Sequence, residues 1–262
     1  MSSDPLLSLL DDPGAAVAAG DPLLQALGRV QTIERVGRVS EAYGTLIKAT
    51  GLRAAIGELC YLRNPGDSSF ELAAEVVGVA RQHTLLTPLG PLDGIAATTE
   101  VYATGKQASV PVGEGLLGRV LDAHGAPIDG KGSLGATVDG PIYAASPNPL
   151  SRNLIERPFA TGVRAIDAVM TAGEGQRIGI FAVAGGGKST LLGMLARGGD
   201  ADVNVIVLVG ERGREVNEFI TDNLGPEGLA RSVVVVATSD RPALERSRAA
   251  WVGTAIAEHF RD

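Results

Sequence analysis

Two patterns of hydrophobic positions divide the chain. From about residue 25 to residue 96, short stretches of alternating or continuous apolar residues are separated by turn residues. Residues 29–40 alternate loosely, residues 56–62 alternate well and residues 72–80 are continuously apolar, and Asn64-Pro65-Gly66-Asp67 falls between the last two. Several short strands at this spacing predict a small antiparallel β-barrel.

After about residue 150 the units become longer. Residues 176–183, 203–209 and 233–238 are strand candidates that are almost wholly apolar. Helix-like segments follow them, and we expect helices over residues 188–197, over residues 215–224 ending at Gly225, and from an opening at Ser239–Pro242 to the end of the sequence. Continuous apolar strands alternating with helices predict a parallel sheet covered on both faces.

The last predicted helix should cross back to another parallel strand. The sequence contains no strand candidate beyond it. We therefore expect an α/β domain that is incomplete at its C-terminus. The chain then divides into a flexible N-terminal arm over residues 1–24, the β-barrel domain over residues 25–96 and the α/β domain over residues 97–262.

The arm is rich in Ala, Gly, Leu, Asp and Pro. Its leucines lie at positions 6, 7, 9 and 10 and could form one short amphipathic turn. Two interpretations stay open, a flexible arm and a docking segment that becomes ordered on a partner.

Composition narrows the class of protein. The net charge of −7 and the aromatic content of 4% argue against a nucleic-acid binder. Cys60 is the only cysteine, so no intrachain disulfide is possible, and its alternating surroundings favour buried packing. The longest apolar runs fall short of the ~18 to 20 residues of a membrane span. No Lys or Arg precedes Arg29, which excludes an ordinary signal peptide and favours a cytoplasmic location.

A glycine-rich loop joins the first strand candidate of the α/β part to the helix after it. The sequence from Ala182 fits A-x-x-x-x-G-K-[ST], a phosphate cradle whose leading glycine is relaxed to alanine. Small residues let backbone N–H groups point at phosphate oxygens, and the helix N-terminus favours the same anion. The alternative is a glycine-rich turn with an incidental lysine.

In a phosphate cradle, Lys188 neutralises the β- and γ-phosphates and the Ser189 hydroxyl binds Mg²⁺. The sequence therefore predicts a nucleotide-binding loop. Its candidate residues are Ala184, Gly185, Gly186, Gly187, Lys188, Ser189 and Thr190.

Charged residues follow the second strand candidate directly. The carboxyl ends of parallel strands face the ligand crevice, so Glu211, Arg212 and Glu215 are expected beside a bound nucleotide. Glu211 could orient and deprotonate a water that attacks the γ-phosphate. Arg212 could pair with phosphate charge, and Glu215 could lie in the outer shell of the metal. A purely structural ion pair is the alternative for these residues.

Other polar residues give weaker signals. The three histidines, at positions 83, 124 and 259, have no metal-ligand spacing, so we expect surface or core roles for them. Arg241, Arg246 and Arg248 fall on the last predicted helix, where a solvated face is expected and a subunit contact is the alternative.

Together these segments resemble a known family. The matching stretches are T-G-V-R-A-I-D, G-E-G-Q-R-I-G-I-F-A, A-G-G-G-K-S-T, V-G-E-R-G-R-E-V, G-L-L-G-R-V-L-D-A-H-G-A-P-I-D-G and P-N-P-L-S-R. They resemble the ATPases of bacterial type III secretion systems, in the injectisome branch, which are relatives of the flagellar export ATPase and the catalytic subunit of rotary ATP synthase. The resemblance runs from about residue 25 to residue 262.

The resemblance implies a RecA-like P-loop domain and a homohexameric ring, held together by the barrel, that hydrolyses ATP with Mg²⁺ at subunit boundaries. Lys188, Glu211 and Arg212 would be catalytic, Ser189 would bind Mg²⁺ and Glu215 would lie near it. A virulence-associated export motor of this kind works in the cytoplasm, peripheral to the inner membrane. It strips chaperones from effectors and unfolds them.

The implied partners are a stator or regulator protein, a central stalk protein and effector–chaperone complexes, with no nucleic acid. The leader resembles the family's arm, which contacts the stator regulator and the membrane periphery.

The sequence departs from the family in what it lacks. These are the strand that ends in the metal-orienting Asp, the arginine finger, the adenine-stacking aromatic residue and the C-terminal helical domain. We expect weak or no turnover from these 262 residues alone. One alternative is a non-catalytic assembly or regulator-binding module. Another is an RNA-translocating hexamer of the transcription-terminator type, against which the acidic, aromatic-poor barrel argues.

Overall fold

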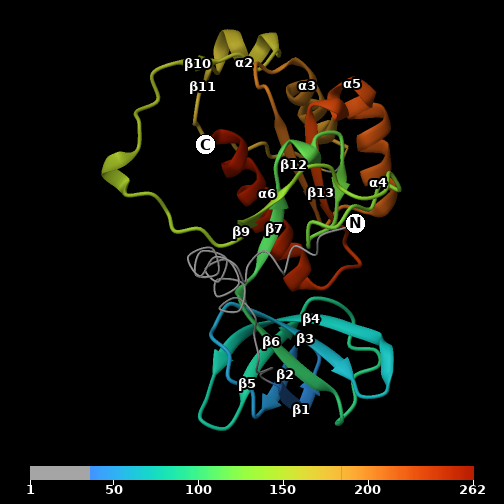
Figure 1. Cartoon of the computed structure of the whole chain (residues 1–262). Helices are drawn as coiled ribbons and strands as arrows, with labels where there is room; N and C mark the ends of the chain where they lie inside the picture. Colours follow the sequence, from blue (N-terminus) through green and yellow to red (C-terminus); the bar gives the residue numbers. More distant parts are fainter. Residues whose placement is uncertain (1–35, 184) are drawn as a thin grey trace, which may run out of the picture.

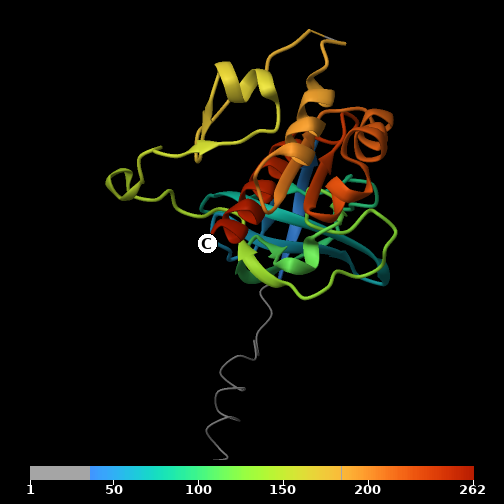
Figure 2. The same ribbon diagram turned by 90° about the horizontal axis from the view of Figure 1, so that it is seen from above.

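The computed structural model describes residues 36–183 and 185–262. A β-barrel lies beside a layered α/β domain, and the two meet along one side of each (Figures 1 and 2). The predicted arm over residues 1–24, the first residues of the predicted barrel and Ala184 lie outside the described residues.

The barrel is closed by six strands in the order β1-β2-β5-β4-β3-β6. Their bounds are β1 Val36–Tyr43, β2 Leu46–Thr50, β3 Glu58–Asn64, β4 Asp67–Val79, β5 Thr84–Pro88 and β6 Glu100–Gln107. All pairings are antiparallel, which confirms the predicted architecture. The predicted boundary at residue 96 is wrong, because the barrel closes only through β6.

The barrel has its own core. Inward positions alternate along each strand, as Cys60 and Leu62 do on β3, and both are fully buried. The continuously apolar stretch in β4 also alternates, with Leu72, Ala74 and Val76 inside. The predicted turn at Asn64–Asp67 joins β3 to β4 as a hairpin, with Gly66 at a φ of 86°.

The α/β domain is built on a parallel sheet in the order β12-β13-β8. The strands are β8 Val120–Leu121, β12 Asn204–Val209 and β13 Ser232–Ala237, and the helices are α3 Lys188–Gly198, α4 Gly213–Glu218, the π-helix η4 Phe219–Leu224, α5 Gly225–Ala230 and α6 Ala243–Arg261. The predicted strands at 203–209 and 233–238 and the helices at 188–197 and after Pro242 are confirmed.

Helices cover both faces of this sheet (Figure 1). On β13, Val233 and Val235 pack with α6, while Val234 and Val236 pack with α3 and the α4–η4 segment. All four valines are buried, which explains why a parallel strand of this kind is apolar at every position.

Two predictions about the α/β elements are wrong. The single helix predicted over residues 215–224 consists of α4 and η4, and Gly225, at a φ of 67°, starts a separate helix α5 with a proline in its first turn. The strand predicted over residues 176–183 is absent from that described segment. Phe181 is 96% exposed and Ile178 56% exposed.

The physical reason for the second error is the lack of a strand beside residues 176–183. Among the described residues, β12 pairs with β13 alone, and no strand lies on its other edge. An apolar segment gains little from an extended conformation when neither its edges nor its faces are covered. The short strand β8 instead adds to the far side of β13, which the sequence pattern did not reveal.

The remaining elements connect these parts. They are β7 Ser109–Val112, the 3-10 helix η2 Glu114–Leu116, β9 Val138–Pro141, the 3-10 helix η3 Pro149–Ser151, β10 Pro158–Phe159, α2 Arg164–Val169 and β11 Ala172–Gly173. Between β9 and β10 the chain swings well away from the body, and Leu150 on this excursion is 95% exposed (Figures 1 and 2). Among the described residues, no helix is both long and apolar enough to cross a bilayer.

A buried ion pair joins the barrel to the α/β domain. Nη1 of Arg248 on α6 lies 2.9 Å from Oε2 of Glu75 on β4, and the Tyr143 hydroxyl donates to the same oxygen at 3.2 Å. The Arg248 side chain is 5% exposed. The solvated face predicted for this arginine is therefore wrong, because its charge is satisfied inside the junction.

Candidate functional site

The glycine-rich loop leads directly into helix α3, which begins at Lys188. Gly185 and Gly187 have φ values of 77° and 78°, a region that residues with a side chain rarely adopt. A Cβ at Gly186 would lie 2.8 Å from the Cβ of Ala182, so this position has no room for one. The loop thus needs its glycines for backbone shape, as a phosphate cradle does.

The first turn of α3 is the anion-attracting end of the loop. N–H groups in the first turn of a helix lack intrahelical partners and carry the positive end of the helix dipole. Lys188, Ser189 and Thr190 stand in this turn and are all exposed. Backbone and lysine therefore favour an anion at the same place.

Lys188 and Glu211 meet across 23 positions of sequence. Lys188 Nζ lies 3.4 Å from Oε1 of Glu211, with side chains 46% and 33% exposed. Both line a cavity of about 230 Å³ together with Ser189 and Glu215. The structure therefore brings together four of the residues that the sequence singled out.

Glu211 is held at the carboxyl end of β12 by backbone contacts. Its carbonyl accepts a hydrogen bond from Ser239 N at 3.0 Å, and the preceding Gly210 N donates to Ala237 O at 2.8 Å. The segment after β13 therefore fixes the position of Glu211. The sequence did not predict this support, because Ser239 lies 28 residues further along the chain.

Arg212 and Glu215 form a local pair. The Arg212 backbone N–H donates to Glu215 Oε2 at 3.3 Å, and its Nη1 lies 3.4 Å from Oε1, so Glu215 caps helix α4. The Arg212 side chain is 78% exposed and lies outside the cavity lined by Lys188 and Glu211. In this structure Arg212 therefore forms the purely structural ion pair that was the alternative expectation for it.

Arg231, which the sequence did not single out, anchors the other end of α3. Its guanidinium donates to four carbonyls at and after the C-terminus of that helix: Ala196 O at 2.7 Å, Arg197 O, Gly199 O and Ala201 O, each at 3.1 Å. The last carbonyls of a helix have no intrahelical partner, and Arg231 supplies donors to those of Ala196 and Arg197, the first of which also accepts from Asn204 Nδ2 at 2.9 Å. An arginine before an apolar strand carries no local signal of a contact some 30 residues away.

The segment Thr161–Asp167 is also structural. Asp167 Oδ1 accepts hydrogen bonds from Thr161 N and Oγ1 at 2.8 and 2.7 Å, and these bonds lower the pKa of Asp167. A Cβ at Gly162 would lie 2.5 Å from the carbonyl oxygen of Gly198, the last residue of α3. Glycine at position 162 therefore allows the backbone to approach the cradle helix closely.

The cavity suits a triphosphate with a divalent cation. Lys188 and the helix N-terminus attract phosphate oxygens, and the Glu211 carboxylate can accept a proton from water. Among the described residues, no cluster of three His, Cys, Asp or Glu could hold a metal on its own. Mg²⁺ would therefore need phosphate oxygens beside Ser189 and the nearby carboxylates, which is its usual manner of binding in nucleotide sites.

Comparisons with known proteins agree in both parts of the chain. Residues 39–105 match the beta-barrel domain of the ATP synthase alpha/beta family, and residues 162–262 match the nucleotide-binding domain of the same family. A Type 3 secretion system ATPase of Xanthomonas euvesicatoria is 54% identical over 249 residues, which is 93% of this chain and 56% of that protein. A Flagellum-specific ATP synthase of Bacillus subtilis is 48% identical over 240 residues, which is 92% of this chain and 55% of that protein.

Solved structures give the same result. The assembled ATPase EscN from the type III secretion system of enteropathogenic E. coli superposes with a TM-score of 0.76 and 44% identity. The match covers 86% of this chain and 54% of that one. EscN in complex with its central stalk EscO superposes with a TM-score of 0.78. The chain thus spans about half the length of the relatives that it matches.

Proposed function

Because the chain belongs to the ATP synthase alpha/beta family, we propose that the protein is an ATP-hydrolysing motor of bacterial type III protein secretion. The observation that carries this proposal is the cavity in which Lys188 and Ser189 of the cradle helix face Glu211 of the neighbouring strand. Relatives that share about half of their aligned residues with this chain are named as secretion and flagellar ATPases, which favours protein export over RNA translocation.

In this proposal Lys188 and the α3 N-terminus hold the β- and γ-phosphates. Ser189 would hold Mg²⁺ together with phosphate oxygens, Glu215 would serve in its outer shell, and the ion would neutralise phosphate charge. The incoming γ-phosphate displaces Glu211 from Lys188, which leaves the carboxylate as the base for the attacking water. Arg212 becomes a phosphate ligand only if nucleotide binding breaks its pair with Glu215, so we assign it a conditional role.

The proposal includes assembly. EscN is described as an assembled ATPase and in complex with a central stalk, and we extend both features to this protein as a homohexameric ring with a stalk partner. A stator or regulator protein and effector–chaperone complexes complete the proposed partners. The ring would work in the cytoplasm, peripheral to the inner membrane.

The isolated 262-residue chain should bind nucleotide but hydrolyse it weakly or not at all. The cavity at the cradle measures only about 230 Å³ and its charged side chains are partly exposed. Water reaches such a site freely, which weakens every electrostatic contribution to catalysis. A non-catalytic assembly module is the second candidate, and the closed barrel with its own core favours it.

Substitution of Lys188 by Ala tests the proposal. Loss of a charge-assisted contact worth about 1.5 to 3 kcal/mol should weaken Mg·ATP binding roughly 10- to 100-fold. Calorimetry would measure the affinity, with Lys131→Ala as control, since Lys131 is exposed and donates to Gly118 O in another loop. In the source bacterium, the same change should abolish effector release into the medium. Unchanged affinity would contradict the nucleotide site; unchanged secretion with lost affinity would contradict only the export role.

A further inference from the structure

A second cavity, of about 250 Å³, lies at the carboxyl end of β13, beside the N-terminus of helix α6. The barrel loop at Leu89–Pro91 and the turn at Asp122–His124 also line it. It shares no lining residue with the cavity at the cradle, so it is a separate feature. Sites for drug-sized ligands measure roughly 300 to 1,000 Å³, so a cavity of this size suits one short chain or one side chain.

Glu245 of α6 is a buried carboxylate without a partner at this cavity. The residue is 5% exposed, and its side chain forms no ion pair or hydrogen bond with any residue that the structure describes. The side-chain polar atoms of described residues that are both unpartnered and closed off from solvent are Nε of Arg246 and Nε of Arg248. Both oxygens of Glu245 therefore keep accessible surface, and a ligand in the cavity that Glu245 lines can reach them.

The place of Glu245 in the first turn of α6 explains its charge but not its burial. An acidic side chain there favours the positive end of the helix dipole, which an exposed carboxylate does as well. Burial raises the pKa of Glu245, Arg241 opposes this rise, and Asp122 and Asp240 add to it. A buried carboxylate without a hydrogen-bond donor is unfavourable, and a cation in the cavity would remove this disadvantage.

The charges on the cavity wall also favour a cation. Two carboxylates, those of Asp122 and Glu245, line it with the single guanidinium of Arg241. Asp122 Oδ1 accepts hydrogen bonds from the backbone N–H groups of His124 and Ala126 at 2.8 and 2.9 Å, which hold this carboxylate in place. Burial lowers the pKa of His124, so the imidazole adds no charge at pH 7. One negative charge on the wall is therefore left without a counter-charge.

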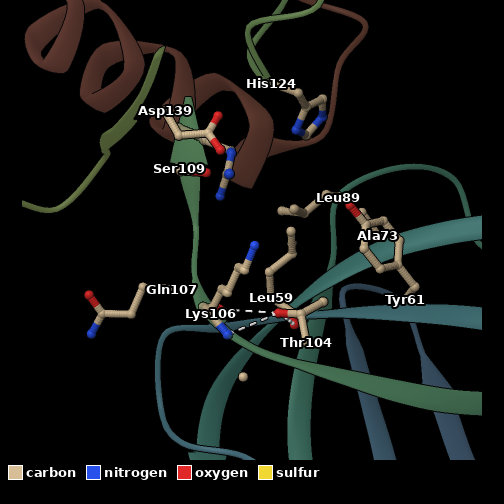
Figure 3. Close-up of a pocket in the computed structure, with 12 residues that line it drawn as sticks. Leu59, Tyr61, Ala73, Leu89, Thr104, Lys106, Gln107, Ser109, His124 and Asp139 are labelled. Atoms are coloured by element: carbon tan, nitrogen blue, oxygen red, sulfur yellow. Dashed lines mark hydrogen bonds between the residues drawn. The ribbon is translucent and has the colours of Figure 1, made fainter. Parts of the chain in front are cut away.

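The remaining wall is mostly apolar. Its apolar side chains are those of Leu89, Pro91, Ala123, Ile128 and Val236. Leu89 and His124 also line a neighbouring cavity of about 920 Å³ between the barrel and the α/β domain, where Figure 3 shows both side chains. Glu245 lines only the smaller of the two. The smaller cavity therefore suits a short apolar chain with one positive end.

We propose that this cavity binds a short primary alkylammonium group. The ammonium donates to the carboxylate of Glu245, and the alkyl chain lies against Ile128 and Val236. An ammonium is a compact charge with three donors, which suits a small cavity better than the wider planar fork of a guanidinium. A free amine and the lysine side chain of a partner protein both carry this group.

The probe for the test is n-pentylammonium, titrated into the 262-residue protein at pH 8. A primary amine is still charged there, and the higher pH favours the ionised form of Glu245. The three histidines give imidazole signals that NMR can follow separately. The His124 signal should shift saturably, while those of His83 and His259, which lie outside the cavity lining, should stay in place.

Substitutions on α6 and before it locate the ligand. Glu245→Gln keeps the size of the side chain and removes its charge, so it should weaken pentylammonium binding about tenfold or more. Glu258→Gln is the same change on the same helix outside this cavity and should leave binding unchanged. Arg241→Gln removes a like charge from the cavity wall and should tighten binding about threefold. Arg241 is exposed, so this variant keeps the fold.

Further compounds separate the contributions and the sources. 1-Pentanol lacks the charge and pentanoate reverses it, and each should bind about tenfold more weakly or less. Nα-acetyl-lysine methylamide carries the same ammonium on a peptide backbone. Binding as tight as that of pentylammonium would support the site and assign a partner's lysine as its source, whereas exclusion of this compound alone would support it and assign free amines.

The proposal is overturned if His124 does not respond, if all three histidines respond alike, or if 1-pentanol matches pentylammonium. It is also overturned if Glu245→Gln binds as tightly as the unchanged protein, since the ligand would then occupy the larger cavity, or if Arg241→Gln weakens binding. Because nucleotide affinity is not the readout, the outcome is independent of the proposed export function.

Discussion

The barrel and the α/β domain differ in how the backbone edges of their strands are paired. Every barrel strand has a partner on both sides, since the six strands close on themselves. In the described α/β sheet, β12 keeps one unpaired edge, and the outer edge of β8 is met only by the bridge between Leu121 and Pro127. Among the residues that the structure describes, the large hydrophobic side chains more than 80% exposed all fall in the second part: Leu150, Leu154, Val169, Phe181 and Val183.

This difference shows where each part obtains its stability. The barrel buries its apolar residues against strands that are near in sequence, so its core is complete within β1 to β6. The α/β domain relies on parallel pairings between distant segments, which need all participating strands in place. The barrel is thus self-sufficient, and the α/β domain has apolar surface available for a further contact.

The largest expected effect comes from breaking the contact between the two parts. Glu75→Ala leaves the buried Arg248 without its carboxylate and should cost about 3 to 5 kcal/mol of unfolding free energy. The matched control is Glu71→Ala in the same strand, whose pair with Arg63 is half exposed and should contribute under about 1 kcal/mol. Urea denaturation measures both. Equal losses would mean that the junction pair contributes no more than a surface pair.

Lowering the pH should reduce the free energy of unfolding through a carboxylate of the α/β domain, Asp129. Arg119 donates to both oxygens of Asp129, and this bonding holds the pKa of Asp129 far below its usual range. A carboxylate with a depressed folded pKa stabilises the protein above its unfolded pKa of about 3.9, and this stability is lost as the pH falls toward the folded value.

Unfolding monitored at Trp251, which lies on α6, should therefore show a loss of stability that begins near pH 4. In Asp129→Asn this part of the pH dependence should disappear. A variant that keeps the same acid transition would show that other carboxylates cause it.

The smallest expected effect concerns the exposed segment before the cradle. Phe181→Ser removes an aromatic ring that is 96% exposed, so the unfolding free energy should change by less than about 0.5 kcal/mol. Self-association, measured by sedimentation velocity, should fall because exposed apolar surface decreases. A large loss of stability would instead show that this ring is packed in solution.

Sequence reasoning succeeded where the determining contacts are local. The alternation in residues 56–62 and the turn at Asn64–Asp67 set a hairpin of adjacent strands, and the glycines at 185 and 187 are required by their own backbone angles. The glycine-rich loop before α3 and the end of β12 just before Glu211 could therefore be predicted, whereas the binding of phosphate by this loop stays a prediction.

It failed where the deciding partner is distant. Residues 176–183 have the composition of a strand but lack a paired neighbour among the described residues, and β8 is a strand only because β13 lies beside it. The same holds for Arg231 at the end of α3 and for Arg248 in the junction, whose partners lie more than 30 and 170 positions away. No local pattern encodes such contacts.

The pair between Glu75 and Arg248 also has a consequence for the order of events during synthesis. The two residues are 173 positions apart. At ribosomal rates of roughly 5 to 20 residues per second, Arg248 is made on the order of 10 to 30 seconds after Glu75. The barrel has time to close before its partner charge exists, so the nascent chain carries a finished barrel whose Glu75 carboxylate remains in water until helix α6 emerges.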